Sequence, residues 1–176
     1  GKGVTFDTGG YCVKPSASQK GMKYDMGGAA MTFAAACAVA ELELPIRLTV
    51  ITPLVENDIS ATAFHTTDVI RTRAGKTVEV GNTDAEGRLI LADGLSLAVE
   101  REPDWIVDAA TLTGACVVAL GEDIAGLYGT DAGLTQQLIQ AGAAVGERFW
   151  ELPLHMPYGA QLKSTIADTS NMGGKW

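Results

Sequence analysis

Apolar runs with the length of strands alternate along this chain with runs that have the length of helices. The predicted strands are residues 3–7, 46–55, 77–80 and 105–112. The predicted helices are residues 27–43, a stretch that follows residues 82–89 and ends near residue 100, and residues 130–144. The β-branched run at 46–55 is the clearest strand, because such side chains fit a pleated surface. This alternation predicts an α/β domain with a largely parallel central sheet flanked by helices.

The remaining segments are predicted to be loops and turns. They are residues 8–23, a turn at Ala74-Gly75-Lys76, and a loop-like tail at 156–176. Pro53 is predicted to end its strand or to place it at a sheet edge. The Ala-rich helix is nearly free of charge, so most of its faces are expected to be covered. Its most apolar stretch has about half the length of a membrane span, which predicts a buried helix and no membrane anchor.

The length and the net charge of the chain limit the classes of protein to which it can belong. The 176 residues are enough for one domain with a core. The 21 acidic and 13 basic residues give a net charge of -8, which argues against a nucleic-acid-binding surface. The cysteines are far apart and form no CxxC pair, which predicts reduced thiols in a cytoplasmic protein. The chain opens at GKGVTFD without a Met, so we expect it to be part of a longer protein.

Four carboxylates stand near the ends of predicted elements. Asp7 ends the first predicted strand, and Asp25 stands just before the Ala-rich helix. Asp84 and Glu86 lie between a predicted strand and a predicted helix. In open α/β sheets, ligands gather outside the carboxyl ends of the strands. We therefore expect the four carboxylates to lie along one rim of the sheet.

Four carboxylates on a desolvated rim require compensation of their charge. Protonation is one solution, because a like-charged neighbour raises the pKa of a carboxyl group. Two divalent cations are the other, since oxygen ligands in this number suit Zn, Mn or Mg, and paired ions are common in hydrolytic sites. The sequence contains no HExxH motif and no Cys–His cluster, so a metal site here has to be built from carboxylates.

A purely structural interpretation accounts for the same residues one at a time. Asp25 and Glu86 can cap helix N-termini, where negative charge is favourable. Asp7 can close a turn with Thr8 and Gly9. The residue pattern alone leaves this interpretation and the metal interpretation both open.

The segment NTDAEGRL, residues 82–89, resembles the signature of the leucyl aminopeptidase family, the two-metal cytosolic aminopeptidases. Other segments match the family in order and spacing: GKGVTFDTGG, VKP, MKYDMGGAA, GKTVEV and DAATLTGA. The chain departs from the family at Thr8, where Ser is commoner, and at residues 65–68, where a Pro-Gly turn is usual. The resemblance implies that residues 1–176 are part of an aminopeptidase catalytic domain, without the N-terminal domain and without the C-terminal end of the catalytic domain.

The resemblance also implies roles for individual residues. It implies five metal ligands, of which the lysine binds as a neutral amine: Lys2, Asp7, Asp25, Asp84 and Glu86. It implies two catalytic residues, one that stabilises an oxyanion and one that binds bicarbonate as the proton acceptor: Lys14 and Arg88, respectively. It implies four residues that contact the substrate: Met22, Thr111, Leu112 and Gly114.

These roles imply an enzyme that hydrolyses N-terminal residues from peptides, preferentially Leu or other apolar residues. It would use two divalent ions, Zn or Mn, with Mg or Co as further candidates. The resemblance also implies a cytoplasmic protein that forms a homohexamer at full length, with no contact with nucleic acid or membranes. The alternative is a truncated or split non-catalytic fragment that binds metal or a partner subunit without turnover.

Overall fold

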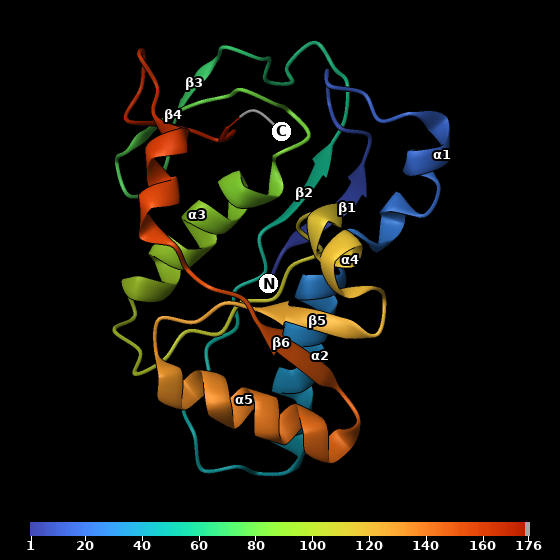
Figure 1. Ribbon diagram of the computed structural model, residues 1–176, viewed down its shortest axis with the longest axis vertical. Helices are drawn as coiled ribbons and strands as arrows, with labels where there is room; N and C mark the ends of the chain where they lie inside the picture. The colour runs from blue at the N-terminus through green and yellow to red at the C-terminus, as the bar shows by residue number, and fades with distance from the viewer. Residues whose placement is uncertain (175–176) are drawn as a thin grey trace. The chain divides into compact units, whose positions relative to one another are not determined.

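The computed structural model describes residues 1–174, which form two compact units. The larger unit contains Gly1–Leu112 and the described residues from Gly159 onward, and the smaller unit contains Thr113–Tyr158. Both units combine helices with strands (Figure 1), which confirms the predicted α/β class. The strands form three small sheets where one central sheet was predicted. Three of the four strand pairs are parallel, as predicted.

Strand β1 (Gly3–Asp7) lies at the centre of the larger unit and pairs in parallel with β2 (Leu54–Asn57). The register shifts between Val4 and Phe6, because β1 contains one residue more than the stretch of β2 that it faces. Val4 is fully buried, which anchors the amino-terminal half of β1 in the core.

A second sheet of the larger unit is built around β4 (Thr77–Glu79). It pairs antiparallel with β3 (Val69–Arg71) and parallel with β7 (Thr169–Ser170). Gly75 has a φ of 82° in the turn between β3 and β4, which confirms the predicted turn. Val78 is buried on this sheet.

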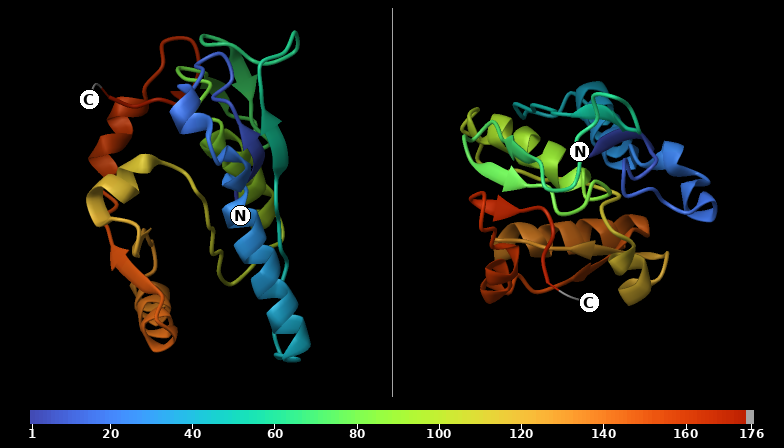
Figure 2. Two further views of the ribbon diagram at one scale, coloured as in Figure 1. Left: turned by 90° about the vertical axis from the view of Figure 1, so that its right-hand side faces the viewer. Right: turned by 90° about the horizontal axis from the view of Figure 1, so that it is seen from above.

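Four helices of the described chain lie entirely within the larger unit: α1 (Ser16–Gln19), η1 (Met22–Tyr24), α2 (Gly27–Glu41) and α3 (Gly87–Val99). The two longer helices confirm the predictions for residues 27–43 and for the stretch that ends near residue 100. The two short helices lie in the segment 8–23, where a loop was predicted. Figure 2 shows α2 extending past the ends of β1 and β2.

The smaller unit is a compact strand–helix–strand arrangement preceded by a short helix. Its elements are α4 (Gly114–Leu120), β5 (Ile124–Leu127), α5 (Ala132–Val145) and β6 (Arg148–Glu151). The strands pair in parallel, and α5 provides the crossover that parallel strands require. A Cβ atom on Gly142 would lie 2.6 Å from the Phe149 ring, so the absence of a side chain lets α5 pack on β6.

Two strand predictions are wrong over most of their length. Within residues 46–55 a strand begins only at Leu54, so Pro53 precedes a strand and does not end one. Residues 105–112 form no regular strand. Single backbone hydrogen bonds replace the ladders, from the Gly1 ammonium to Ile51 O and from Lys2 N to Ala109 O. Residues 46–55 and 105–112 both lie next to β1, which has only five residues. Most residues of each segment therefore have no neighbouring strand in the described chain with which to form a ladder.

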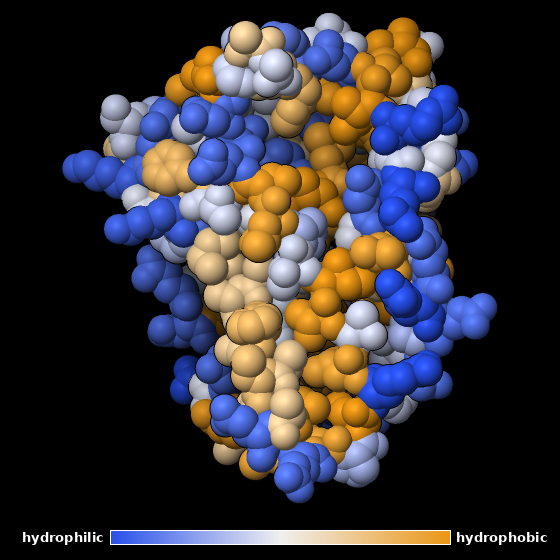
Figure 3. All heavy atoms as spheres, turned by 180° about the vertical axis from the view of Figure 1, so that it is seen from behind, coloured by the Kyte–Doolittle hydropathy of each residue, from blue (hydrophilic) through white to orange (hydrophobic). Residues whose placement is uncertain are grey.

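The expected burial of the Ala-rich helix is also wrong. Only Gly28 and Ala29 of α2 are buried, whereas Met31 and Phe33 are 58% and 63% exposed. The reason is that α2 contacts β1 through its first turn and then leaves the sheet. Figure 3 shows apolar side chains reaching the surface of the molecule. Among the helices in residues 1–174, none is both long and apolar enough to cross a membrane.

The tail from residue 156 contains more structure than predicted. It forms the 3₁₀ helix η2 (Met156–Leu162) and strand β7, while residues 175–176 lie outside the described part. Asp168 accepts hydrogen bonds from the Thr77 N–H and hydroxyl, both at 2.8 Å. A partner 91 positions away in the sequence therefore holds this segment, which local sequence patterns cannot show.

The N-cap of α5 provides a test of the fold of the smaller unit. The Asp131 side chain accepts a hydrogen bond from Leu134 N–H at 2.9 Å. Asp131→Ala removes the acceptor and is expected to lower the free energy of opening of α5 by about 1 kcal/mol, whereas Asp131→Ser retains an acceptor and most of the stability. Amide hydrogen exchange of α5 measures both. Equal exchange rates in the two variants would show that the cap contributes nothing.

Candidate metal centre

Both ends of β1 carry residues of the candidate site. Lys2 immediately precedes the strand and Asp7 is its last residue, and each is 2% exposed. Side chains on a strand alternate between faces, so residues five positions apart would normally point to opposite sides. The extra residue in β1, at Thr5, shifts this alternation. Lys2 and Asp7 consequently reach the same neighbour, Glu86.

The Lys2 ammonium is buried among oxygen acceptors. Its Nζ lies 2.9 and 2.8 Å from the two carboxylate oxygens of Asp25 and 3.0 Å from Oε1 of Glu86. It also donates a hydrogen bond to the backbone carbonyl of Thr111 at 3.0 Å. The Thr111 hydroxyl donates to Asp25 Oδ1 at 2.7 Å. Lys2 therefore joins β1, the start of α2 and the start of α3 at one buried point.

A second lysine bridges the other two carboxylates. Lys14 Nζ lies 2.9 Å from Asp7 Oδ2 and forms a shorter ion pair with Asp84 Oδ1. Burial by itself lowers the pKa of this ammonium, but hydrogen bonds to Asp84 and Asp7 outweigh it and raise the pKa of Lys14 to about 12. Lys14 therefore carries a positive charge beside two carboxylates.

Three carboxylates converge in a cluster with the spacing of a metal site. Asp7, Asp84 and Glu86 each present an oxygen, and these oxygens lie within 4.8 Å of one another. Burial raises the pKa of Glu86, against the opposing charge of Lys2. Burial also raises the pKa of Asp84, against its hydrogen bond from Lys14. The ionised cluster is therefore costly in the absence of a stronger cation.

The donor set fits a divalent metal. Asp25 Oδ2 and Asp84 Oδ1 are buried and accept no well-directed hydrogen bond, although each lies within ion-pair distance of a lysine. Buried carboxylate oxygens normally have hydrogen-bond partners, so these two are suited to a cation as ligand. Together with Lys2 they complete a set of carboxylate oxygens and one amine, which suits Zn or Mn.

The structure also tests the alternative of helix caps and turns. The N-cap of α2 is Met26 and that of α3 is Glu86, and neither position makes a side-chain cap hydrogen bond. Glu86 therefore stands at a helix N-terminus and Asp25 one residue before one, as this interpretation expects, but neither helix has a side-chain cap hydrogen bond. Asp7 Oδ1 accepts from Gly9 N–H at 2.9 Å, so the predicted turn is confirmed. Its other oxygen remains directed at Lys14.

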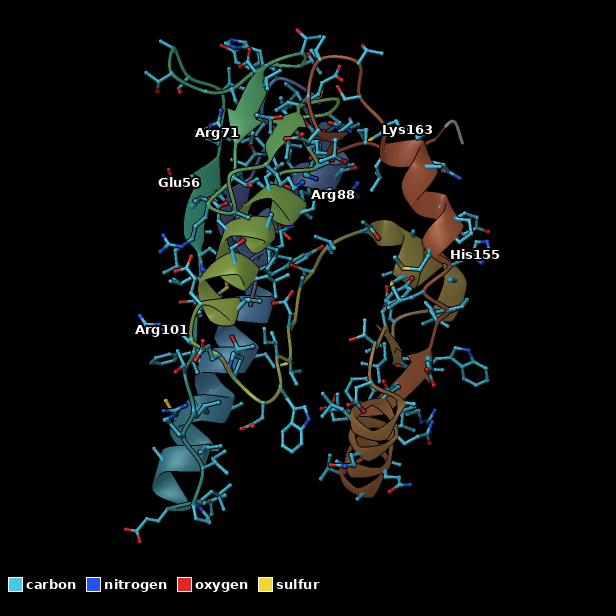
Figure 4. The ribbon with its side chains drawn as sticks, turned by 90° about the vertical axis from the view of Figure 1, so that its left-hand side faces the viewer. Glu56, Arg71, Arg88, Arg101, His155 and Lys163 are labelled. Atoms are coloured by element: carbon cyan, nitrogen blue, oxygen red, sulfur yellow. The ribbon has the colours of Figure 1, made fainter. Side chains whose placement is uncertain are left out.

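Arg88 lies in the first turn of α3 (Figure 4). Its Nη1 donates a hydrogen bond to the backbone carbonyl of Asn171 at 2.6 Å. The guanidinium is therefore held by a neutral acceptor, and its charge is available to an anion.

The predicted substrate residues occupy different parts of the chain. Met22 is half-buried and begins η1, and Thr111 contacts both Lys2 and Asp25. Leu112 packs next to Gly87, where a Cβ would lie 3.0 Å from Leu112 Cδ1. Gly114 begins α4 in the smaller unit.

Three buried polar residues next to the carboxylates or to the loop that carries Asp84 were missed by the sequence reasoning: Asn57, Thr83 and Asn171. Asn57 Nδ2 donates to Asp7 Oδ1 at 2.8 Å, to Thr83 O at 3.0 Å and to Glu86 Oε2 at 3.4 Å. The Thr83 hydroxyl donates to Gly9 O at 2.6 Å and accepts from Cys12 N–H at 2.7 Å. Asn57 follows a predicted strand, which was a usable signal, whereas Asn171 lies in the predicted loop-like tail.

Comparison with known proteins decides the family. The model of the cytosol aminopeptidase family, catalytic domain, matches residues 1–176. The chain belongs to this family. A probable cytosol aminopeptidase of Nitrosomonas eutropha is 53% identical over 176 residues, and one of Pseudomonas fluorescens is 52% identical over 174 residues. The matches cover 100% and 99% of this chain but 35% of each relative, so the chain spans about a third of their length.

Two solved structures share the fold of this chain. The cytosol aminopeptidase of Coxiella burnetii has a TM-score of 0.95 at 44% identity, over 99% of this chain and 38% of that chain. The bottromycin maturation enzyme BotP in complex with Mn has a TM-score of 0.93 at 44% identity, over 98% of this chain and 38% of that chain. The family is metal-dependent, which agrees with the donor set around Asp7, Asp84 and Glu86.

The raised pKa of Glu86 gives a test that needs no substrate. In the metal-free protein, folded Glu86 binds its proton more tightly than the unfolded chain does. As the pH falls from 8 toward 5, wild type is therefore expected to gain stability relative to Glu86→Gln, which binds no proton at this position. Urea unfolding of both chelator-treated proteins measures the difference. A difference that stays constant over this range would show that Glu86 ionises normally.

Proposed function

We propose that the protein containing this chain is a two-metal aminopeptidase that removes N-terminal residues from peptides, preferentially Leu or other apolar residues. The observation that carries the proposal is the convergence of Asp7, Asp84 and Glu86 with one buried lysine, Lys2, and one partly exposed lysine, Lys14. Membership of the cytosol aminopeptidase family supports the reaction class. A carboxylate cluster of this kind can hold the paired ions of a two-metal hydrolytic site.

Five residues would hold the metals: Lys2, Asp7, Asp25, Asp84 and Glu86. When bound, the divalent ions supply Lewis acidity that polarises the scissile carbonyl group. Zn and Mn suit this mixture of oxygen and nitrogen donors, and Mg and Co are further candidates. As a ligand, Lys2 would bind as the neutral amine, a form that a dication at bonding distance favours.

Lys14 supplies a fixed positive charge next to the cluster. Its contacts with Asp7 and Asp84 keep the ammonium protonated and oriented. A charged donor held beside a reacting carbonyl stabilises the negative charge that develops on oxygen. We assign this role to Lys14 because its side chain is 17% exposed, whereas that of Lys2 is 3% exposed.

Arg88 is proposed to bind bicarbonate, which accepts a proton during hydrolysis. One N–H group of its planar fork is engaged with Asn171 O. Its remaining N–H groups can bind a planar anion through two parallel hydrogen bonds. No histidine is found among the described partners of the carboxylates, so an external base is consistent with this site.

Substrate recognition is proposed to involve four residues: Met22, Thr111, Leu112 and Gly114. Thr111 already contacts Lys2 and Asp25, which places its backbone beside the candidate metal ligands. A peptide bound here would present its first side chain to Met22. At full length we expect a cytoplasmic homohexamer that acts on peptides and contacts neither nucleic acid nor membranes.

A second candidate is a fragment that binds metal or a partner subunit without turnover. The exposure of Met31, Phe33 and other large apolar side chains favours it for these 176 residues on their own. Hydrolysis of leucine p-nitroanilide by the isolated chain and by the full-length protein separates the two candidates. Turnover by the isolated chain would exclude the second candidate.

Metal removal tests the proposed function directly. We expect a chelator to abolish hydrolysis of leucine p-nitroanilide by the full-length protein, and added Zn or Mn to restore it. The reason is that the proposed reaction relies on the divalent ions to polarise the scissile carbonyl group. Full activity in protein shown by elemental analysis to be metal-free would refute the proposal.

Two substitutions separate metal binding from catalysis. Asp84→Asn is expected to lose metal and activity together. Lys14→Ala is expected to retain metal while kcat falls about 10²- to 10³-fold, the usual cost of one oxyanion donor. Asp104→Asn removes the same charge as Asp84→Asn from an exposed position and serves as the control. Loss of metal in Lys14→Ala equal to that in Asp84→Asn would reverse the assignment.

A further inference from the structure

Asn171 makes an unusually large number of hydrogen bonds to the loop that carries Asp84. It follows β7 and is 2% exposed. Its Oδ1 accepts from Gly81 N–H at 2.7 Å and from Asn82 N–H at 3.2 Å. Its Nδ2 donates to Asn82 O at 2.7 Å and to Ala85 O at 3.3 Å. One side chain therefore binds both backbone donors and backbone acceptors of the loop.

The loop has little regular structure of its own. Residues 81–85 belong to no helix or strand. Within the loop, Asn82 Oδ1 accepts from Asp84 N–H at 2.8 Å, and Asn82 O accepts from Ala85 N–H at 3.2 Å. Asn171 connects this local turn to a segment 86 to 90 positions away in the sequence. The position of the turn in the larger unit therefore depends on Asn171.

The same residue holds Arg88. The backbone carbonyl of Asn171 accepts the hydrogen bond from Arg88 Nη1 at 2.6 Å. Its own N–H donates to Glu79 O at 3.0 Å, which fixes Asn171 to the end of β4. A candidate metal ligand and a candidate anion-binding residue thus share one support.

The packing around Gly81 shows how closely the loop of residues 81–85 approaches residues 170–172. A Cβ atom on Gly81 would lie 2.9 Å from Met172 Cβ and 3.2 Å from Ser170 Oγ. Any side chain at this position would push the loop away from residues 170–172. Gly81→Ala therefore disturbs the contact from the loop side while Asn171 stays intact.

We propose that Asn171 is a positioning residue that fixes the Asp84 loop and Arg88 relative to each other. Buried partners that orient metal ligands typically change metal affinity or activity 10- to 100-fold when they are removed. The consequence for catalysis rests on the proposed function. The consequences for loop mobility and metal affinity do not, because both can be measured without a substrate.

The experiment compares three variants of the full-length protein: Asn171→Ala, Gly81→Ala and Asp168→Ala. Asp168 is the matched control, because it holds the same segment through Thr77 and has no hydrogen bond or ion pair with residues 81–85 or Arg88 in the described structure. Each protein is measured by amide hydrogen exchange, by calorimetric titration of the chelated protein with Mn²⁺, and by kcat and KM for leucine p-nitroanilide.

Asn171→Ala is expected to speed exchange of the Gly81 and Asn82 amides about tenfold, as loss of a hydrogen bond does. Its affinity for Mn²⁺ is expected to fall about 10- to 100-fold. The kinetic effect is expected in kcat more than in KM, because transition-state contacts depend on Asp84 and Arg88. Gly81→Ala is expected to show the same pattern at Asn82, and Asp168→Ala to keep the exchange and Mn²⁺ affinity of wild type.

The proposal is wrong if Asn171→Ala matches Asp168→Ala in both loop exchange and Mn²⁺ affinity. If Asn171→Ala does not fold, the test rests on Gly81→Ala. The proposal is then overturned if Gly81→Ala binds Mn²⁺ as tightly as wild type does. Altered exchange and Mn²⁺ affinity would support the role of Asn171 even if wild type failed to cleave the peptide analogue. That last result would refute the proposed function alone.

Discussion

The buried charges at the two ends of β1 are the constraint on which the rest of the larger unit depends. Two lysines pair with four carboxylates, and if all six groups are ionised two negative charges remain uncompensated. Buried ion pairs recover their desolvation cost only when the geometry is excellent. The raised pKa values of Asp84 and Glu86 show that the lysines compensate incompletely. A divalent cation would resolve this imbalance, and the cluster has the ligand types that such a cation requires.

Neutral polar side chains hold these charges in place. Asn57 engages one oxygen of Asp7 and one of Glu86, which leaves the other oxygen of each directed at a lysine. Thr83 joins the Asp84 loop to the turn after β1 through Gly9 and Cys12. Such hydrogen bonds restrict the rotation of each carboxylate, because one of its oxygens is already bound. They therefore fix the orientation of the candidate ligands.

Local sequence patterns were sufficient to predict the elements that form through local interactions. The helices α2 and α3 and the turn at Gly75 follow from composition and backbone preference, and they were predicted. The strand predictions at 46–55 and 105–112 failed, because a strand exists only where a partner completes its ladder. The burial predicted for α2 failed for a related reason, since a helix is covered only where another element meets it.

The sequence by itself indicated which residues are candidates for the chemistry. Lys2, Asp7, Asp84 and Glu86 are recognisable because their order and spacing are written in short segments such as NTDAEGRL. Only the tertiary structure decided how they meet. The extra residue in β1 turns Lys2 and Asp7 toward the same carboxylate, and an asparagine some 90 positions from Gly81 holds the loop that carries Asp84. Strand register and contacts between distant segments set these relations, and neither leaves a signal in the local sequence.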